Sequence, residues 1–237
     1  MAKGLLYSKS IRINDKIHIA IPKVGDVFDN EENYYGLVTM VTATPYELMV
    51  QLDDIGIDFT TINEFELFCL LFSELQKKDT SLVFGDLSLD RFEFAVNNQN
   101  GDIVLRDEEQ DITIDKAIHR DISDALRRIN FYDKTNKRPA NDEAKKFLIE
   151  RARAKQKRAM RKLKESQLEN LIVALVNTKE YHYDFDSTRE LSLYQFNASA
   201  QQVIKKINYD NTMIGCYAGT VNAKELNPDQ LTWLTNK

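Results

Sequence analysis

Within residues 103–129, IVLRDEEQDITIDKAIHRDISDALRRI, the hydrophobic period changes, and the expected fold follows from that change. Up to Ile114, apolar residues tend to recur at every second position, which is the spacing of a half-buried β-strand. After Asp115 they fall three or four positions apart, as on the buried face of an α-helix. That face consists of Ile118, Ile122, Ala125, Leu126 and Ile129. The sequence therefore predicts an α+β protein, with a mixed N-terminal part and a mostly helical C-terminal part.

Two β-hairpins are expected before residue 115. Residues 11–21 alternate between isoleucines and mostly polar residues around an Asn14-Asp15 turn, which is the pattern of a half-buried hairpin. Residues 88–105 alternate in the same way, and we expect residues 112–114 to join this second hairpin.

Helices are expected where a hydroxyl or amide side chain precedes a hydrophobic run. Thr44 and Thr61 each lie three residues before a glutamate, the spacing of a capping box, and they predict helices over 45–53 and 62–77. A short helix is expected within 34–41.

The same signals recur toward the C-terminus. Ser166 and Ser187, each followed three residues later by glutamate, predict two helix starts, and Asn227-Pro228 predicts a short terminal helix. We expect a long basic helix over 141–165. These elements suggest a mixed domain over residues 1–114 and a helical domain over 115–237.

Charge is distributed very unevenly along the chain. The net charge is -5, from 32 basic and 37 acidic side chains, but residues 1–110 sum to 9 - 20 = -11 and residues 111–237 to 23 - 17 = +6. Most of the excess lies in residues 145–164, KKFLIERARAKQKRAMRKLK, where ten cations accompany one acid, Glu150. Past Ile149 the apolar stripe is too thin to bury a face, so this helix is expected to contact solvent or a partner.

Three interpretations of the basic helix follow. Its cations are solvated or lie along the acidic N-terminal half of the same or a neighbouring subunit; they neutralise the phosphates of RNA or DNA; or they dock onto an acidic protein. No aromatic residue lies between Arg151 and Lys162 for base stacking, which weighs against nucleic acid. The candidate contact residues are Arg151, Arg153, Lys155, Lys157, Arg158, Arg161 and Lys162.

No known catalytic motif is found in the sequence. The three histidines have no cysteine or second histidine at metal-ligand spacing, and there is no glycine-rich phosphate loop. We therefore expect no enzyme, no cofactor and no metal. No secretory signal or membrane-length apolar tract is visible, so we expect a cytoplasmic protein without a membrane contact.

Large aromatic residues and glycines gather in the last 45 residues. One interpretation is a helical core closed by a glycine turn at Gly215 or Gly219. The other is a docking tail with Tyr217 and Trp233 as anchors, because aromatic residues with one polar edge are typical of protein interfaces.

The segments IHIAIPKVGDVFD, PYELMVQLDDIGIDFTTINEFELF, LSLYQF, GCYAGTVNAKEL and LTWL resemble proteins encoded beside the tail genes of phages and prophages of Gram-positive bacteria. Tail or baseplate assembly proteins of the chaperone type are the nearest likeness. The resemblance implies a non-enzymatic phage structural or assembly protein that binds other proteins, such as tail or baseplate components. It implies host-cell cytoplasm or virion as location and assigns no functional residue. A second copy of the chain is a further candidate partner, as in a homo-oligomer. The alternative function is that of a nucleic-acid-binding protein that uses residues 145–164.

Overall fold

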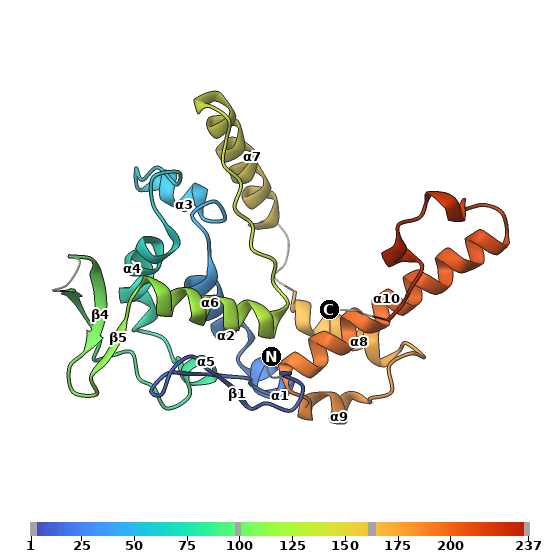
Figure 1. The fold of residues 1–237 in the computed structure, drawn as a ribbon, viewed down its shortest axis with the longest axis horizontal. Helices are drawn as coiled ribbons and strands as arrows, with labels where there is room; N and C mark the ends of the chain where they lie inside the picture. The colour runs from blue at the N-terminus through green and yellow to red at the C-terminus, as the bar shows by residue number, and fades with distance from the viewer. Residues whose placement is uncertain (1–3, 98–100, 161–164, 235–237) are drawn as a thin grey trace.

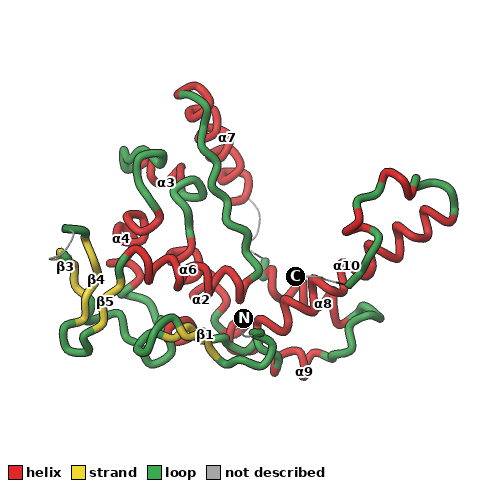
Figure 2. The backbone as a smooth tube through the Cα atoms, viewed as in Figure 1, coloured by secondary structure: helices red, strands yellow, loops and turns green. Residues whose placement is uncertain are grey.

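The computed structural model describes residues 4–97, 101–160 and 165–234. Figures 1 and 2 show two small sheets formed by the N-terminal half, while the C-terminal half is helical. The predicted α+β class is confirmed.

A β-hairpin opens the fold, as predicted. It pairs β1 (Ser10–Arg12) antiparallel with β2 (His18–Ala20). The side-chain oxygen of Asn14 accepts hydrogen bonds from the backbone N–H groups of Lys16 and Ile17, at 2.9 and 2.8 Å. Asparagine side chains stabilise turns in this way.

The second sheet has three antiparallel strands in the order β3-β4-β5: β3 (Glu93–Val96), β4 (Ile103–Asp107) and β5 (Ile112–Ile114). The predicted hairpin and the predicted third strand are both confirmed. Leu105 and Ile114 face each other across β4 and β5 and are fully buried.

Helices form the rest of the chain. In the N-terminal half they are α1 (Val24–Asp29), α2 (Glu31–Thr42), α3 (Met49–Asp54), α4 (Glu64–Leu75) and α5 (Ser81–Phe84). In the C-terminal half they are α6 (Lys116–Asn130), α7 (Asp142–Met160), α8 (Gln167–Val176), α9 (Phe185–Glu190) and α10 (Leu193–Tyr217), followed by the 3₁₀ turns η1 (Ala223–Glu225) and η2 (Pro228–Gln230).

The main core is built around α6. This helix contacts α2, α4, α10 and β5. The largest fully buried side chains of this core include Tyr34, Phe68, Phe72 and Phe196. The core draws residues from both sides of position 114, from Leu5 to Val203. The division into domains 1–114 and 115–237 stays a prediction.

Buried polar side chains of α6 donate hydrogen bonds to backbone carbonyl oxygens at the C-terminal end of α2. His119 Nε2 donates to the carbonyl oxygen of Val41 at 3.0 Å, and the Arg127 guanidinium donates to that of Thr42. The His119 ring also stacks on Phe68, with centroids 4.4 Å apart. Burial lowers the pKa of His119 to about 4, so the imidazole is neutral at pH 7.

Helix α4 begins two residues later than its expected capping box. Its N-cap is Asn63, whose side chain accepts from the N–H groups of Phe65 and Glu66, and Glu66 returns a bond to the Asn63 N–H. The predicted Thr61 cap is wrong, because the Thr61 hydroxyl closes a turn onto the Asp58 carbonyl instead.

The expected cap at Ser187 is also wrong. Ser187 is the third residue of α9, which Asp184 caps. The following long helix begins with a separate capping box between Ser192 and Gln195. Asp184 and Ser192 cap better because each directly precedes the first helical turn.

Three other boundaries are informative. Thr44 and Glu47 exchange the expected bonds, but they close a turn and α3 begins only at Met49. Ser166 caps α8 as predicted, by accepting from the Glu169 N–H at 2.8 Å. The terminal helix is a single 3₁₀ turn, Pro228–Gln230, that ends before Trp233.

Candidate interface on the basic helix and the C-terminal arm

The basic helix α7 stands beside α3, away from the main core (Figure 1). The side chain of Asn141 accepts from the Ala144 N–H at 2.8 Å, and Asp142 and Glu143 occupy the first turn, where acids favour the helix dipole. The helix is described to Met160, so the last part of the expected basic helix 141–165 lies outside the described residues.

One face of α7 is docked. Leu148, Ile149 and Ala152 pack against a second apolar cluster, separate from the main core. Its buried members are Ala43, Met49, Val50, Leu52, Phe59 and Leu67. The apolar stripe is short, but it suffices for the first three turns of the helix because α3 presents a matching surface.

Ion pairs extend this docked face. Arg153 reaches Asp53 at 2.7 Å and Asp54 at 2.6 Å, at the end of α3. Lys145 reaches Asp58 at 2.8 Å. Lys145 and Arg153 therefore lie along the acidic N-terminal half of the same chain.

Asp58 shows the electrostatic effect of this docking. Its carboxylate accepts from the Lys145 ammonium and from the Thr60 N–H and hydroxyl, and these hydrogen bonds lower the pKa of Asp58 to about 2. The same contact raises the pKa of Lys145 above its ordinary value. Both groups stay charged across the physiological pH range.

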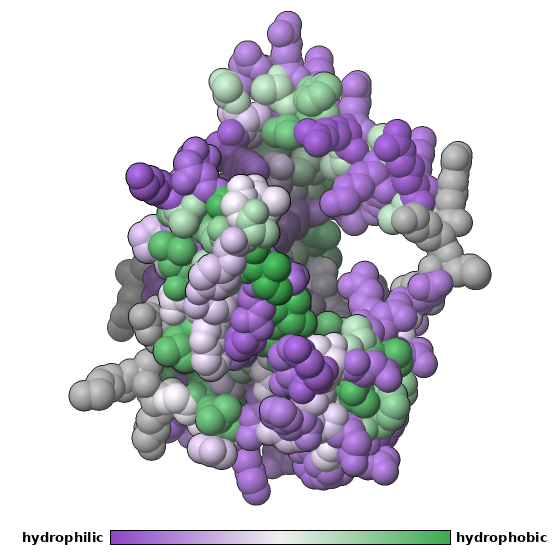
Figure 3. Space-filling view, turned by 90° about the vertical axis from the view of Figure 1, so that its right-hand side faces the viewer, coloured by the Kyte–Doolittle hydropathy of each residue, from purple (hydrophilic) through white to green (hydrophobic). Residues whose placement is uncertain are grey.

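The opposite face of α7 is open. Its exposed cations are Lys146, Arg151, Lys155, Lys157 and Arg158. None of these five forms an ion pair with another residue that the structure describes. Hydrophilic side chains cover much of the part of the molecule where α7 lies (Figure 3). Of the predicted contact residues, Arg161 and Lys162 lie outside the described residues.

Phe147 is the member of this face that the sequence reasoning missed. Its side chain is 62% exposed. Phe147, Arg151, Ala154 and Arg158 follow the i, i+4, i+7, i+11 spacing and share one helix face. That spacing was visible in the sequence. We call this stripe, with Lys146, Lys155 and Lys157 beside it, the cationic face.

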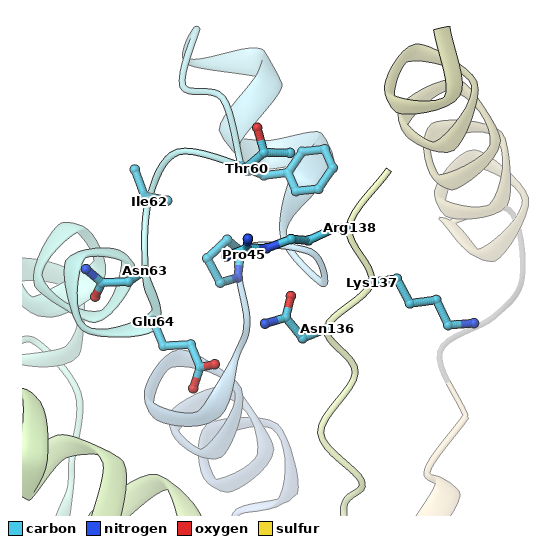
Figure 4. Close-up of a pocket in the computed structure, with 9 residues that line it drawn as sticks. Pro45, Thr60, Ile62, Asn63, Glu64, Asn136, Lys137 and Arg138 are labelled. Atoms are coloured by element: carbon cyan, nitrogen blue, oxygen red, sulfur yellow. The ribbon is translucent and has the colours of Figure 1, made fainter. Parts of the chain in front are cut away.

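A shallow pocket lies between the α3–α4 loop and the chain leading to α7 (Figure 4). Arg138 extends toward Pro45, whereas Lys137 points away. Glu64, at its floor, pairs with Lys134 at 2.6 Å.

The C-terminal arm projects from the other side of the body (Figure 1). The buried residues of α10 are Leu193, Phe196, Ala200 and Val203, all in its first half. Beyond Val203 the helix continues for fourteen residues, to Tyr217, and the chain then returns along it. We call residues 204–234 the arm.

Trp233 and Tyr217 occupy different positions on the arm. The Trp233 carbonyl accepts from the Gln202 amide at 2.6 Å, and the Lys206 ammonium lies 5.8 Å from its ring centroid. Trp233 therefore helps to hold the returning chain on α10. The Tyr217 side chain, by contrast, is 89% exposed at the tip. The predicted glycine turn is at Gly219, with φ of +73°.

The described ranges contain no group of three or more histidine, cysteine or acidic side chains placed to hold a metal ion. Nor do they contain a helix both long enough and apolar enough to cross a membrane. The absence of an enzymatic activity stays a prediction.

Comparison with known proteins gives one match. A family model described as the YomV second domain matches residues 155–237. The match fits a phage-related origin. It covers the last turns of α7 together with α8, α9, α10 and the returning chain. No curated protein and no solved structure matches the chain.

Proposed function

We propose that this protein is a non-enzymatic phage or prophage assembly factor whose cationic face binds an acidic protein partner, such as a tail or baseplate component. The observation that carries the proposal is the two-sidedness of α7. One side is fixed to α3 by apolar contacts and by Arg153, and to Asp58 by Lys145. The other side presents five exposed cations around Phe147, which form no ion pair within the described part of the chain.

The composition of this face favours a protein partner. Arginine and exposed aromatic residues are the side chains most enriched among the energetic centres of protein interfaces. The acids Glu143 and Glu150 are also exposed on α7. They repel a phosphate backbone running along the helix, whereas a folded partner places its own charges to suit them.

Because α7 is already held on α3, it loses little conformational entropy when a partner binds. A helix already held on α3 loses less conformational entropy on association than a free segment does. Long-range attraction between the cationic face and an acidic partner speeds their encounter, and salt weakens this attraction.

The test is affinity capture from cells producing the phage or prophage, with and without nuclease, followed by mass measurement of the complex. The variant is Arg151→Glu with Arg158→Glu. The matched control is Lys9→Glu with Lys116→Glu, which makes the same charge change at exposed cations outside α7.

We expect wild type and control to retain the same protein after nuclease treatment, and the α7 variant to lose it. Recovery that disappears with nuclease favours RNA or DNA as the partner. Unchanged recovery by the α7 variant contradicts a role for the cationic face.

A further inference from the structure

The exposed half of α10 continues the stripe by which its first half packs on the body. Leu193, Phe196, Ala200 and Val203 recur at three-and-four spacing and are buried. The same spacing leads on to Ile207, which still packs against the main core, and then past Asp210 to Ile214 and Tyr217. Ile214 is 65% exposed. The apolar stripe of α10 therefore extends beyond the part of the helix that packs on the main core.

The returning chain does not cover this stripe. It contacts α10 at Gln202, Lys205 and Lys206, and Thr220 and Val221 fold back onto Gly215. At 100° per residue, Gln202 and Lys205 point well away from Ile207 and Ile214. Ile204, at the edge of the stripe, is 50% exposed.

The apolar positions of this part of α10 are symmetric along the helix, with Ile207 partly buried and Ile204, Ile214 and Tyr217 exposed. Ile204 and Tyr217 are equally distant from the midpoint between Asp210 and Asn211, and so are Ile207 and Ile214. A second copy running antiparallel through that midpoint places Ile207 opposite Ile214 and Ile204 opposite Tyr217. Two-fold contacts require this kind of self-complementary pattern.

The polar centre is also complementary. Asp210 of one copy faces Asn211 of the other, so a carboxylate acceptor meets an amide donor on each side of the axis. Within each copy Lys206 pairs with Asp210 at 2.5 Å, which offsets the approach of the two carboxylates.

We propose that the arm is a dimerisation element, in which the exposed stripes of two copies of this chain pack antiparallel about residues 210 and 211. Residues 204–217 span about 21 Å. A contact of this length is small for a protein interface, so the dimer is weak and its population depends on concentration. This inference concerns a different surface from the cationic face and does not depend on the proposed function.

The first test is the molar mass of the full chain over a series of concentrations, measured by sedimentation velocity. We expect a monomer–dimer equilibrium that Ile214→Asp abolishes and that Val173→Asp, an equally apolar-to-charged change at a 47% exposed site on α8, leaves intact. Tyr217→Asp is a second variant, at a site too exposed to affect folding. A monomer at every concentration overturns the inference, as does a dimer that both arm variants retain.

The second test fixes the direction of pairing by disulfide cross-linking. In a Cys69→Ser, Cys216→Ser background, one copy carries Ile207→Cys and a copy of different size carries Ile214→Cys. We expect the mixed disulfide to dominate. In the antiparallel pair, residue 207 of one copy lies about 10 Å along the helix from residue 207 of the other, and the same holds for residue 214, which is beyond the reach of a disulfide. Preferential cross-linking of each variant to itself indicates a parallel pair and overturns the antiparallel arrangement.

Discussion

Helices α7 and α10 both extend away from the main core, but their open surfaces have opposite chemistry. Helix α7 is held by a short apolar stripe and two ion-pair contacts, and its open side is cationic. Helix α10 is held by a continuous apolar stripe, and the same stripe is open beyond Val203. Charge suits a selective encounter with an acidic partner, whereas an uncovered apolar stripe suits self-association. One molecule thus presents two surfaces with different expected responses to salt.

The largest expected effect separates the two halves of α10. Phe196→Ala removes a fully buried ring and is expected to lower the free energy of unfolding by about 3–5 kcal/mol. Ile214→Ala, in the exposed half, is expected to change it by less than about 0.5 kcal/mol in dilute solution. Urea unfolding of the two variants measures the difference. Similar losses would mean that the exposed half is packed in the monomer.

The next prediction concerns the stability of the main core at acidic pH. The pKa of buried His119 is lowered to about 4, and an unfolded histidine titrates near 6.5. Between these values the unfolded chain takes up a proton that the folded chain does not, so stability falls as pH falls from about 6.5 to about 4. The expected loss is about 3 kcal/mol.

Denaturant unfolding at several pH values measures this loss. His119→Gln is expected to lose the dependence in that pH window, and His18→Gln, at an exposed strand position, to keep it. If His119→Gln keeps it, another group is responsible.

The next effect distinguishes the two sides of α7. Arg153→Ala breaks contacts to Asp53 and Asp54, so it is expected to lower the melting temperature, and to lower it less at high salt. Arg151→Ala, on the open side, is expected to cost less than about 0.5 kcal/mol. Thermal unfolding at low and high salt compares them. Equal effects would show that the docked side contributes no more than the open one.

The smallest effect concerns Asp58. Its lowered pKa, about 2, means that its interaction with Lys145 stabilises the fold above pH 4 and that this contribution is lost as pH falls toward 2. NMR titration of the carboxyl group is expected to show the shift, and Lys145→Met to raise the pKa toward its ordinary value. Lys146→Met, one residue along on the open side, is expected to leave it unchanged.

The sequence predicts the elements whose period is unambiguous. The alternation at residues 11–21 and the helical spacing from Ile118 to Ile129 each correspond to a single element. Caps are harder to place, because several residues compete. Thr61 and Asn63 both lie three residues before a glutamate, and only the three-dimensional turn at Asp58 selects Asn63.

The candidate interface was only partly predictable. The cations of α7 were evident, but their partners Asp53, Asp54 and Asp58 lie about ninety to a hundred residues earlier, and no local pattern connects them. The apolar stripe of α10 was evident as well. Its change from buried to exposed after Val203 depends on where the body ends, which is a property of the tertiary fold.

The most direct test of the contrast between the two helices is sedimentation velocity at low and high salt, on wild type, Ile214→Asp and the Arg151→Glu, Arg158→Glu variant. We predict that wild type and the α7 variant form the same dimer and that salt does not weaken it, since apolar association is not screened. Ile214→Asp stays monomeric. A dimer that salt dissociates, or that the α7 variant loses while Ile214→Asp keeps it, would contradict the assignment of self-association to the arm.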